Sequence, residues 1–231
     1  MKELNINGVL IELEKKKIKN MYLKVLPPDG RIHICAPLRM SEEEIGRFVI
    51  ARFDWIEKQQ IKIRNRSIPH ELFYESGDVL SIWGRKYNLI VNENRGENSL
   101  DLQGDNIVLS MKGTSTSLQR KKVIYTWYRK ILESEIHCLL EKWEKIMGVK
   151  AESFTMRDMK TRWGTCNVRT KNICLNLQLV TKDPKCLEYV VVHELVHLLE
   201  RSHNQIFKMY MDKFLPNWRI IKKELNSTIT E

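Results

Sequence analysis

The segment His193-Glu194-Leu195-Val196-His197 contains the residue types that a metal-dependent hydrolase needs. On an α-helix, residues four positions apart lie about 40° apart around the axis and one turn along it, so both imidazoles can reach one metal ion from the same side. Glu194 can contact a water molecule on the metal without being a ligand itself. Neutral imidazole nitrogens suit zinc, and three protein ligands leave a fourth position open. The pattern predicts a catalytic zinc site with Glu194 as its general base.

The third ligand is expected at His203, six residues after His197. On one unbroken helix His203 would point about 240° away from the metal, so the helix must end first. Ser202 and Gln205 have the spacing of a capping box, which predicts a new helix and a break near residues 200–201. A sharp turn at that break can bring the third imidazole back to the metal.

Two acidic residues further along the chain, Asp212 and Glu224, are the alternative third ligands. Proximity and residue type favour His203 over both of them. We therefore expect one zinc ion per chain, held by His193, His197 and His203.

The elements that position this site have their own signals in the sequence. Asp183 followed by Pro184 combines an N-cap residue with a first-turn proline, which predicts the start of the helix that carries the motif, and this helix should run to about residue 199. Residues 172–179 alternate as a strand does, and residues 123–143 trace a long amphipathic helix that ends at Gly148.

The first half of the chain is rich in short β-type runs separated by turn residues. Ser41 and Glu44 form a capping box that predicts one helix over about residues 42–56. The expected fold class is α+β. A β-rich region with one helical segment occupies residues 1–114, and the metal-binding catalytic domain occupies residues 115–231. No internal repeat is visible in the sequence.

Composition narrows the class of protein. Hydrophobic residues make up 42% and charged residues 29% of the chain, which is typical of a globular protein. The first residues lack the apolar core of a signal peptide, and no apolar run is long enough to span a bilayer. The five cysteines form no CxxC pair, so we expect reduced thiols and a cytoplasmic location. The net charge of +10 favours anionic partners, but the basic residues are spread along the chain.

Three segments resemble the YgjP-like metal-dependent hydrolases, relatives of the SprT-like and Wss-type zinc proteases. They are residues 161–166 (TRWGTC), 188–197 (EYVVVHELVH) and 202–207 (SHNQIF). The resemblance implies a minimal zincin core with an HExxH active-site helix. Thr165 stands where the YgjP-like pattern usually has serine. The histidine spacing also equals that of the metzincins, but Glu200 replaces their glycine, which argues against a metzincin turn.

Four residues near the motif are candidates for substrate binding. Arg162 can bind an anionic group or stabilise negative charge in the transition state, although a structural ion pair is an equal alternative. Trp163 precedes the strand that borders the cleft in zincins, and a core role is equally expected. Asn176 lies on a strand that can pair with an extended peptide. Tyr189 lies one turn before His193 on the same helix face.

Several functions fit these residues. The first is a metallopeptidase, in which metal-bound water activated by Glu194 attacks a peptide bond. The second is a nucleoside triphosphate pyrophosphatase or phosphohydrolase, for which the basic residues would hold phosphates. A DNA-associated protease is a third, although no nucleic-acid module is recognisable and nucleic acid is only weakly supported as a partner. A purely structural zinc site would leave Glu194 without a role. The position of residues 172–179 should distinguish the first two, since an exposed edge strand beside the metal suits a peptide.

Overall fold

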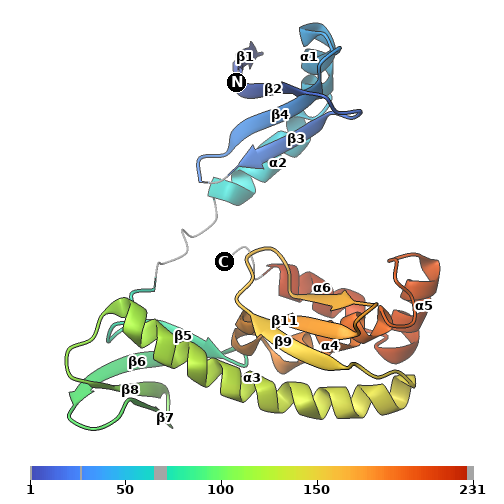
Figure 1. Cartoon of the computed structure of the whole chain (residues 1–231). Helices are drawn as coiled ribbons and strands as arrows, with labels where there is room; N and C mark the ends of the chain where they lie inside the picture. Colours follow the sequence, from blue (N-terminus) through green and yellow to red (C-terminus); the bar gives the residue numbers. More distant parts are fainter. Residues whose placement is uncertain (1, 27, 65–71, 228–231) are drawn as a thin grey trace. The chain divides into compact units, whose positions relative to one another are not determined.

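The structure is a computed structural model that describes residues 2–26, 28–64 and 72–227. The chain divides into two compact units, Met1–His70 and Glu71–Ile229, which we term the N-terminal and C-terminal units (Figure 1). Each unit has a hydrophobic core of its own.

The N-terminal unit is a four-stranded sheet covered on one face by two helices. Its sheet has the order β1-β2-β4-β3, with a parallel β2–β4 pair between two antiparallel pairs. The core lies between the sheet and the helices, where Ile32, Ile34, Ile45 and Val49 are at most 1% exposed. The elements are β1 (Lys2–Ile6), β2 (Val9–Lys16), β3 (Tyr22–Leu26), β4 (Arg31–Pro37), α1 (Glu42–Ile50) and α2 (Phe53–Arg64).

The helical segment of this unit begins where the sequence predicts it. Ser41 caps α1, and its hydroxyl accepts a hydrogen bond from Glu44 N while the Glu44 carboxylate accepts one from Ser41 N. The expected single helix is two helices, because α1 ends at a C-cap residue, Ala51, and α2 starts at Phe53.

The C-terminal unit opens with a second four-stranded sheet of the same topology. Its order is β5-β6-β8-β7, again with a central parallel pair between two antiparallel pairs. The first hairpin of each sheet turns through two residues with positive φ, Asn7-Gly8 in one and Trp83-Gly84 in the other, as a type I′ turn requires. The strands are β5 (Val79–Ile82), β6 (Arg85–Asn94), β7 (Ser99–Gln103) and β8 (Asn106–Lys112). The fold therefore repeats a topology that the sequence does not reveal.

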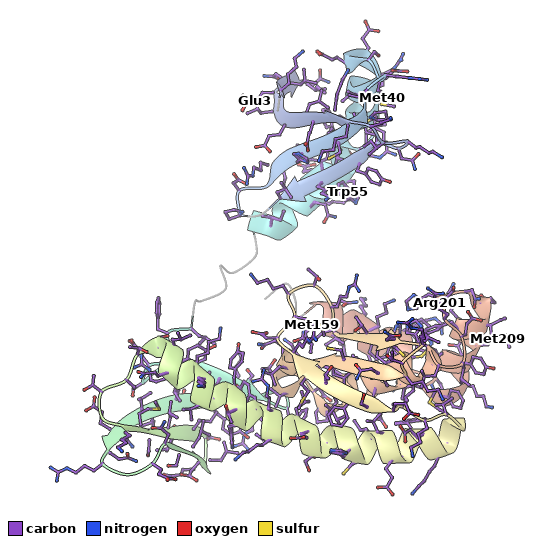
Figure 2. The ribbon with its side chains drawn as sticks, in the orientation of Figure 1. Glu3, Met40, Trp55, Met159, Arg201 and Met209 are labelled. Carbon is purple, nitrogen blue, oxygen red and sulfur yellow. The ribbon has the colours of Figure 1, made fainter. Side chains whose placement is uncertain are left out.

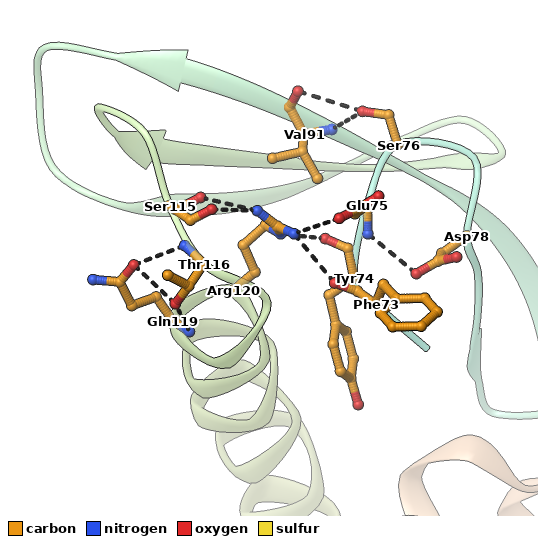
Figure 3. A network of polar contacts seen from close by, with 10 residues as sticks. All are labelled: Phe73, Tyr74, Glu75, Ser76, Asp78, Val91, Ser115, Thr116, Gln119 and Arg120. Atoms are coloured by element: carbon orange, nitrogen blue, oxygen red, sulfur yellow. Dashed lines mark hydrogen bonds and ion pairs between the residues drawn. The ribbon is translucent and has the colours of Figure 1, made fainter. Parts of the chain in front are cut away.

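A long helix, α3 (Ser117–Met147), follows this sheet and runs on beneath the rest of the unit (Figure 1). Thr116 and Gln119 form its capping box, and Gly148 ends it in the left-handed conformation, φ 68°, as the sequence predicts. In its first turn Arg120, 9% exposed, donates hydrogen bonds to the backbone oxygens of Phe73, Tyr74 and Ser115 (Figure 3). This cluster fixes the start of the unit to the start of the helix.

The remaining elements form a three-stranded sheet and three helices. The sheet has the order β10-β11-β9, so β11 lies in the centre and β10 and β9 are its edges. The helix α4 packs against α3, α5, α6 and this sheet. The elements are β9 (Ser153–Arg157), β10 (Gly164–Asn167), β11 (Asn172–Asn176), the 3-10 helix η1 (Leu177–Thr181), α4 (Pro184–Val196), α5 (Gln205–Phe214) and α6 (Trp218–Ser227).

The observed architecture is a mixed α+β fold, as predicted. The two units divide near residue 70 rather than between residues 114 and 115. The physical reason is that the second β-rich stretch packs on α3 in one continuous core, in which Leu80, Leu89 and Ile124 are at most 2% exposed. Among the described helices, none is both long and apolar enough to cross a bilayer.

Candidate metal centre

The motif lies at the C-terminal end of the buried helix α4. Asp183 caps this helix by accepting a hydrogen bond from Lys185 N at 3.0 Å, and Pro184 occupies its first position, as predicted. Nine of its thirteen residues are buried, as expected for a helix with neighbours on several sides. The helix ends earlier than expected, at Val196, so that His197 is its C-cap residue.

The third histidine is brought to the site by tight turns between α4 and α5. Backbone hydrogen bonds from Leu199 N and Glu200 N to Val196 O tighten the chain after the helix end. The predicted break near residues 200–201 is confirmed, but the cap of the next helix is Asn204 rather than Ser202. The Asn204 side chain accepts a hydrogen bond from Phe207 N at 3.0 Å, and α5 starts at Gln205.

The three imidazoles converge on one point. The ring centroids of His193, His197 and His203 lie 4.7 to 5.0 Å apart, and Nε2 of His193 is 2.9 Å from Nε2 of His203. One ligand atom from each ring falls within 4.8 Å of the other two. The Phe207 ring, 2% exposed, lies 4.7 to 4.9 Å from all three imidazoles and holds the rings against one another.

The two acidic alternatives for the third ligand are engaged elsewhere. Asp212 accepts hydrogen bonds from Trp218 Nε1 at 2.8 Å and from Arg219. Glu224 pairs with Lys185 Nζ at 2.8 Å. The group that offers converging ligand atoms in the motif region is therefore the three-histidine cluster.

The electrostatics of the cluster favour neutral imidazoles, the form that binds metals. Burial, followed by the neighbouring His197, His203 and Lys222, lowers the pKa of His193 to about 3. Burial also lowers the pKa values of His197 and His203.

The hydrogen-bonding groups of the rings also fit a metal site. Nδ1 of His197 lies 3.3 Å from the Glu200 backbone oxygen, an arrangement that leaves Nε2 free as a ligand. Nδ1 of His193 is buried and has no hydrogen-bond partner in the described chain. Three neutral imidazoles with converging nitrogens form a donor set that fits a divalent metal such as zinc.

Glu194 lies beside the cluster, 4% exposed, under the first residue of β10. A Cβ atom at Gly164 would lie 2.6 Å from Glu194 Oε1 and 2.8 Å from Val190 Cγ1, so only glycine leaves room for the carboxylate. Burial raises the pKa of Glu194 to about 8, and the positive charge of Arg162 opposes this shift.

The histidines and Glu194 open into a cleft of about 940 Å³. All four residues of β10 line it, together with Arg162 before the strand and Arg169 after it. Residues 172–179 do not form an exposed edge strand, so the condition under which they would favour a peptide is not met. The strand β11 is paired on both sides and the chain turns into η1 after Asn176. The edge that borders the cleft is β10, which in the described chain pairs with β11 alone.

A scan against protein-family models matches residues 19–228 to the YgjP-like, metallopeptidase domain. The chain belongs to the YgjP-like family. This membership supports a metal-dependent hydrolase of the peptidase class, in agreement with the resemblance of the sequence motifs.

Two solved structures are similar to part of this YgjP-like chain. The metallopeptidase zymogen abylysin of Pyrococcus abyssi is 20% identical, with a TM-score of 0.38 over 40% of this chain and 93% of that protein. The metallopeptidase zymogen jannalysin of Methanocaldococcus jannaschii is 18% identical, with a TM-score of 0.35 over 42% of this chain and 96% of that protein. No curated protein matches the chain significantly.

Of the four expected substrate-binding residues, the YgjP-like structure places Arg162 in the cleft lining. The Asn176 side chain is 3% exposed and is used within the fold, donating to the backbone oxygens of Met159 and Arg162 at 2.7 Å each. Trp163 packs against the core, with Lys182 Nζ 5.9 Å from its ring centroid. Tyr189 is 6% exposed and lies against the His193 ring at 5.7 Å. Asn176, Trp163 and Tyr189 are not among the residues that line the cleft.

Sequence reasoning assigned no role in the site to four residues that shape it: Gly164, Phe207, Arg169 and Arg201. Phe207 lies four residues after His203, close enough along the chain for the two side chains to meet. The close approach of Gly164 to Glu194 and the position of Arg201 in the cleft depend on how distant elements pack, and local patterns carry no signal for them.

Proposed function

We propose that this chain is a zinc-dependent peptidase in which His193, His197 and His203 hold the metal and Glu194 is the general base. The observation that carries the proposal is the convergence of the three imidazoles beside one buried carboxylate in an open cleft. A bound zinc ion supplies Lewis acidity, which lowers the pKa of water and polarises a carbonyl group.

The protein's own contribution begins with Glu194. Its carboxylate accepts a proton from the attacking water and later gives it to the leaving amine. Burial raises the pKa of this carboxyl group, whereas the positive charge of a bound metal ion would favour its ionised form, the form that accepts a proton. Arg162 keeps the ionised form within reach by placing a positive charge nearby.

The substrate position that we propose is the free edge of β10. An extended peptide can add to an unpaired strand edge through backbone hydrogen bonds. β10 supports this role because its residues line the cleft that holds the histidines. A peptide on this strand would lie alongside Glu194, which packs beneath Gly164.

Hydrolysis of nucleoside triphosphates is the second candidate, and the arginines of the cleft are the observation that favours it. Guanidinium groups bind phosphate oxygens as well as carboxylates. Family membership and the free strand edge support the peptidase over this alternative.

The test is peptide hydrolysis by the zinc-loaded protein, compared with Glu194→Gln. We expect the variant to keep its zinc and to lose at least about a hundredfold in kcat/KM, the usual contribution of a general base. Glu133→Gln, which removes an exposed carboxylate from α3, should leave the rate unchanged. His197→Ala should lose both metal and activity. Unchanged peptide hydrolysis in Glu194→Gln would refute the assignment.

A further inference from the structure

Three arginines line the cleft, two beside the strand β10 and one between α4 and α5. Arg162 lies just before β10, Arg169 lies in the turn after it, and Arg201 lies between α4 and α5. Figure 2 shows Arg201 at the end of the C-terminal unit where α5 lies, with Met209 close by.

None of these three guanidinium groups forms an ion pair with a carboxylate in the described chain. Other arginines of the C-terminal unit are paired, among them Arg85 with Asp105, Arg120 with Glu75 and Arg219 with Asp212. Arg169 and Arg201 therefore have no ion-pair partner in the described chain, and the one acidic group that Arg162 is near is the buried Glu194.

Carboxylates are scarce among the residues that line the cleft. Glu194 is the one carboxylate among the described lining residues, and it is buried beneath β10. A concave surface with positive charge and little opposing charge attracts anions and raises their local concentration. Arginine in particular binds carboxylates through two parallel hydrogen bonds.

We propose that the cleft selects peptides with aspartate or glutamate side chains on both sides of the scissile bond. This inference rests on the proposed peptidase function and specifies its substrate class. Arg162 and Arg169 bind acidic side chains near the two ends of β10, and Arg201 binds one on the side of α5.

The spacing of the arginines favours an extended chain over a compact anion. Arg162 and Arg169 flank all four residues of β10, and four residues of extended strand span about 13 Å. A peptide lying along the strand passes both guanidinium groups, with its side chains alternating in direction. A compact phosphate chain bound at one end of β10 would leave the guanidinium group at the other end without a ligand.

The test uses the zinc-loaded full-length protein and three synthetic peptides. Cleavage sites are first found by mass spectrometry in a random peptide mixture. One cleaved sequence is then prepared with flanking glutamates, glutamines or lysines. We expect kcat/KM to fall at least about tenfold from the glutamate to the glutamine peptide, as loss of charge-assisted hydrogen bonds implies, and to fall further for the lysine peptide.

The arginines are tested in the double variant Arg169→Gln/Arg201→Gln. The ratio of rates for the glutamate and glutamine peptides should fall towards one. Arg157→Gln removes an exposed charge from β9, the opposite edge of the same sheet, and should keep the original ratio.

The outcomes separate this inference from the function on which it rests. Peptide cleavage with no preference for glutamate, or a preference that survives the double variant, overturns the inference and leaves the peptidase function intact. Glu194-dependent release of phosphate from nucleoside triphosphates, without peptide cleavage, overturns both. A glutamate preference that disappears in the double variant and persists in Arg157→Gln supports both.

Discussion

Gly164 shows how one missing side chain sets the position of the general base. The Glu194 carboxylate and the Val190 side chain fill the space that a Cβ atom at residue 164 would need. The close approach explains why a glycine begins the strand that borders the cleft.

Gly164→Ala should therefore displace Glu194. We expect at least about a hundredfold loss in kcat/KM, because small shifts of a reacting group have effects of this size. Metal content should stay unchanged, since the three atoms nearest the added methyl group belong to Glu194 and Val190 and not to the histidines. Gly96→Ala is the matched control, because a Cβ atom there meets nothing within 4 Å. Full activity in Gly164→Ala would contradict the placement of Glu194.

Cys166 reports on the polarity of the same cleft. Burial, followed by the negative charge of Glu194, raises the pKa of its thiol to about 11. Because the thiolate is the reactive form, Cys166 should react slowly with iodoacetamide at pH 7. Its rate constant should rise about tenfold per pH unit up to about pH 10, as expected for a thiol well below its pKa. Peptide mass spectrometry of the native protein measures this rate residue by residue, and a plateau below pH 9 would contradict the prediction.

At the scale of elements, the sequence predicts best where local chemistry decides the structure. The cap at Asp183-Pro184 and the end of α3 at Gly148 are confirmed, because capping depends on neighbouring residues. The break after the motif is also confirmed. The helix that follows it is capped by Asn204 rather than Ser202. Both residues have side chains that can cap a helix, and the packing of Phe207 against His203 favours the later start.

The role of the strands could not be predicted in this way. Residues 172–179 have the alternation of a strand, but alternation does not say which neighbours pair with it. The parallel partner β9 and the antiparallel partner β10 enclose β11 and leave β10 at the edge. Asn176 was predicted to contact substrate because it lies on this strand. In the structure its side-chain amide instead donates hydrogen bonds to the backbone oxygens of residues 159 and 162.

Arg120 illustrates an element-scale contact that a stability measurement can test. Arg120→Met should lower the free energy of unfolding by about 3 kcal/mol, because it leaves several backbone oxygens without donors (Figure 3). Urea unfolding followed by tryptophan fluorescence reports this change, since most tryptophans belong to the C-terminal unit. Arg129→Met, on the exposed side of the same helix, should change the value by less than about 0.5 kcal/mol. Equal effects of the two substitutions would contradict the structural role of Arg120.

At the scale of the whole molecule, the chain uses the same four-stranded topology twice, each time followed by helical structure. The histidines, Glu194 and the whole cleft lining belong to the C-terminal unit. The position of the division could not be derived from composition, because β-rich segments occur in both units. It follows from which strands share a core with α3.

The folded structure also shows where part of the net charge of +10 is concentrated. The sequence distributes its basic residues widely, so charge alone did not indicate a site. Folding brings three arginines from separate segments into one cleft with a single buried carboxylate. The relevant quantity is therefore the local charge of the cleft rather than the total charge of the chain.

The central claim, a three-histidine metal centre, is tested most directly by the metal content of the purified protein. Mass spectrometry should find about one zinc ion per chain in the wild type, as expected for a single three-ligand site. His203→Ala should lose most of this zinc, because one of the three converging imidazoles is removed. Full zinc content in His203→Ala, or no metal in the wild type after zinc is supplied, would contradict the account.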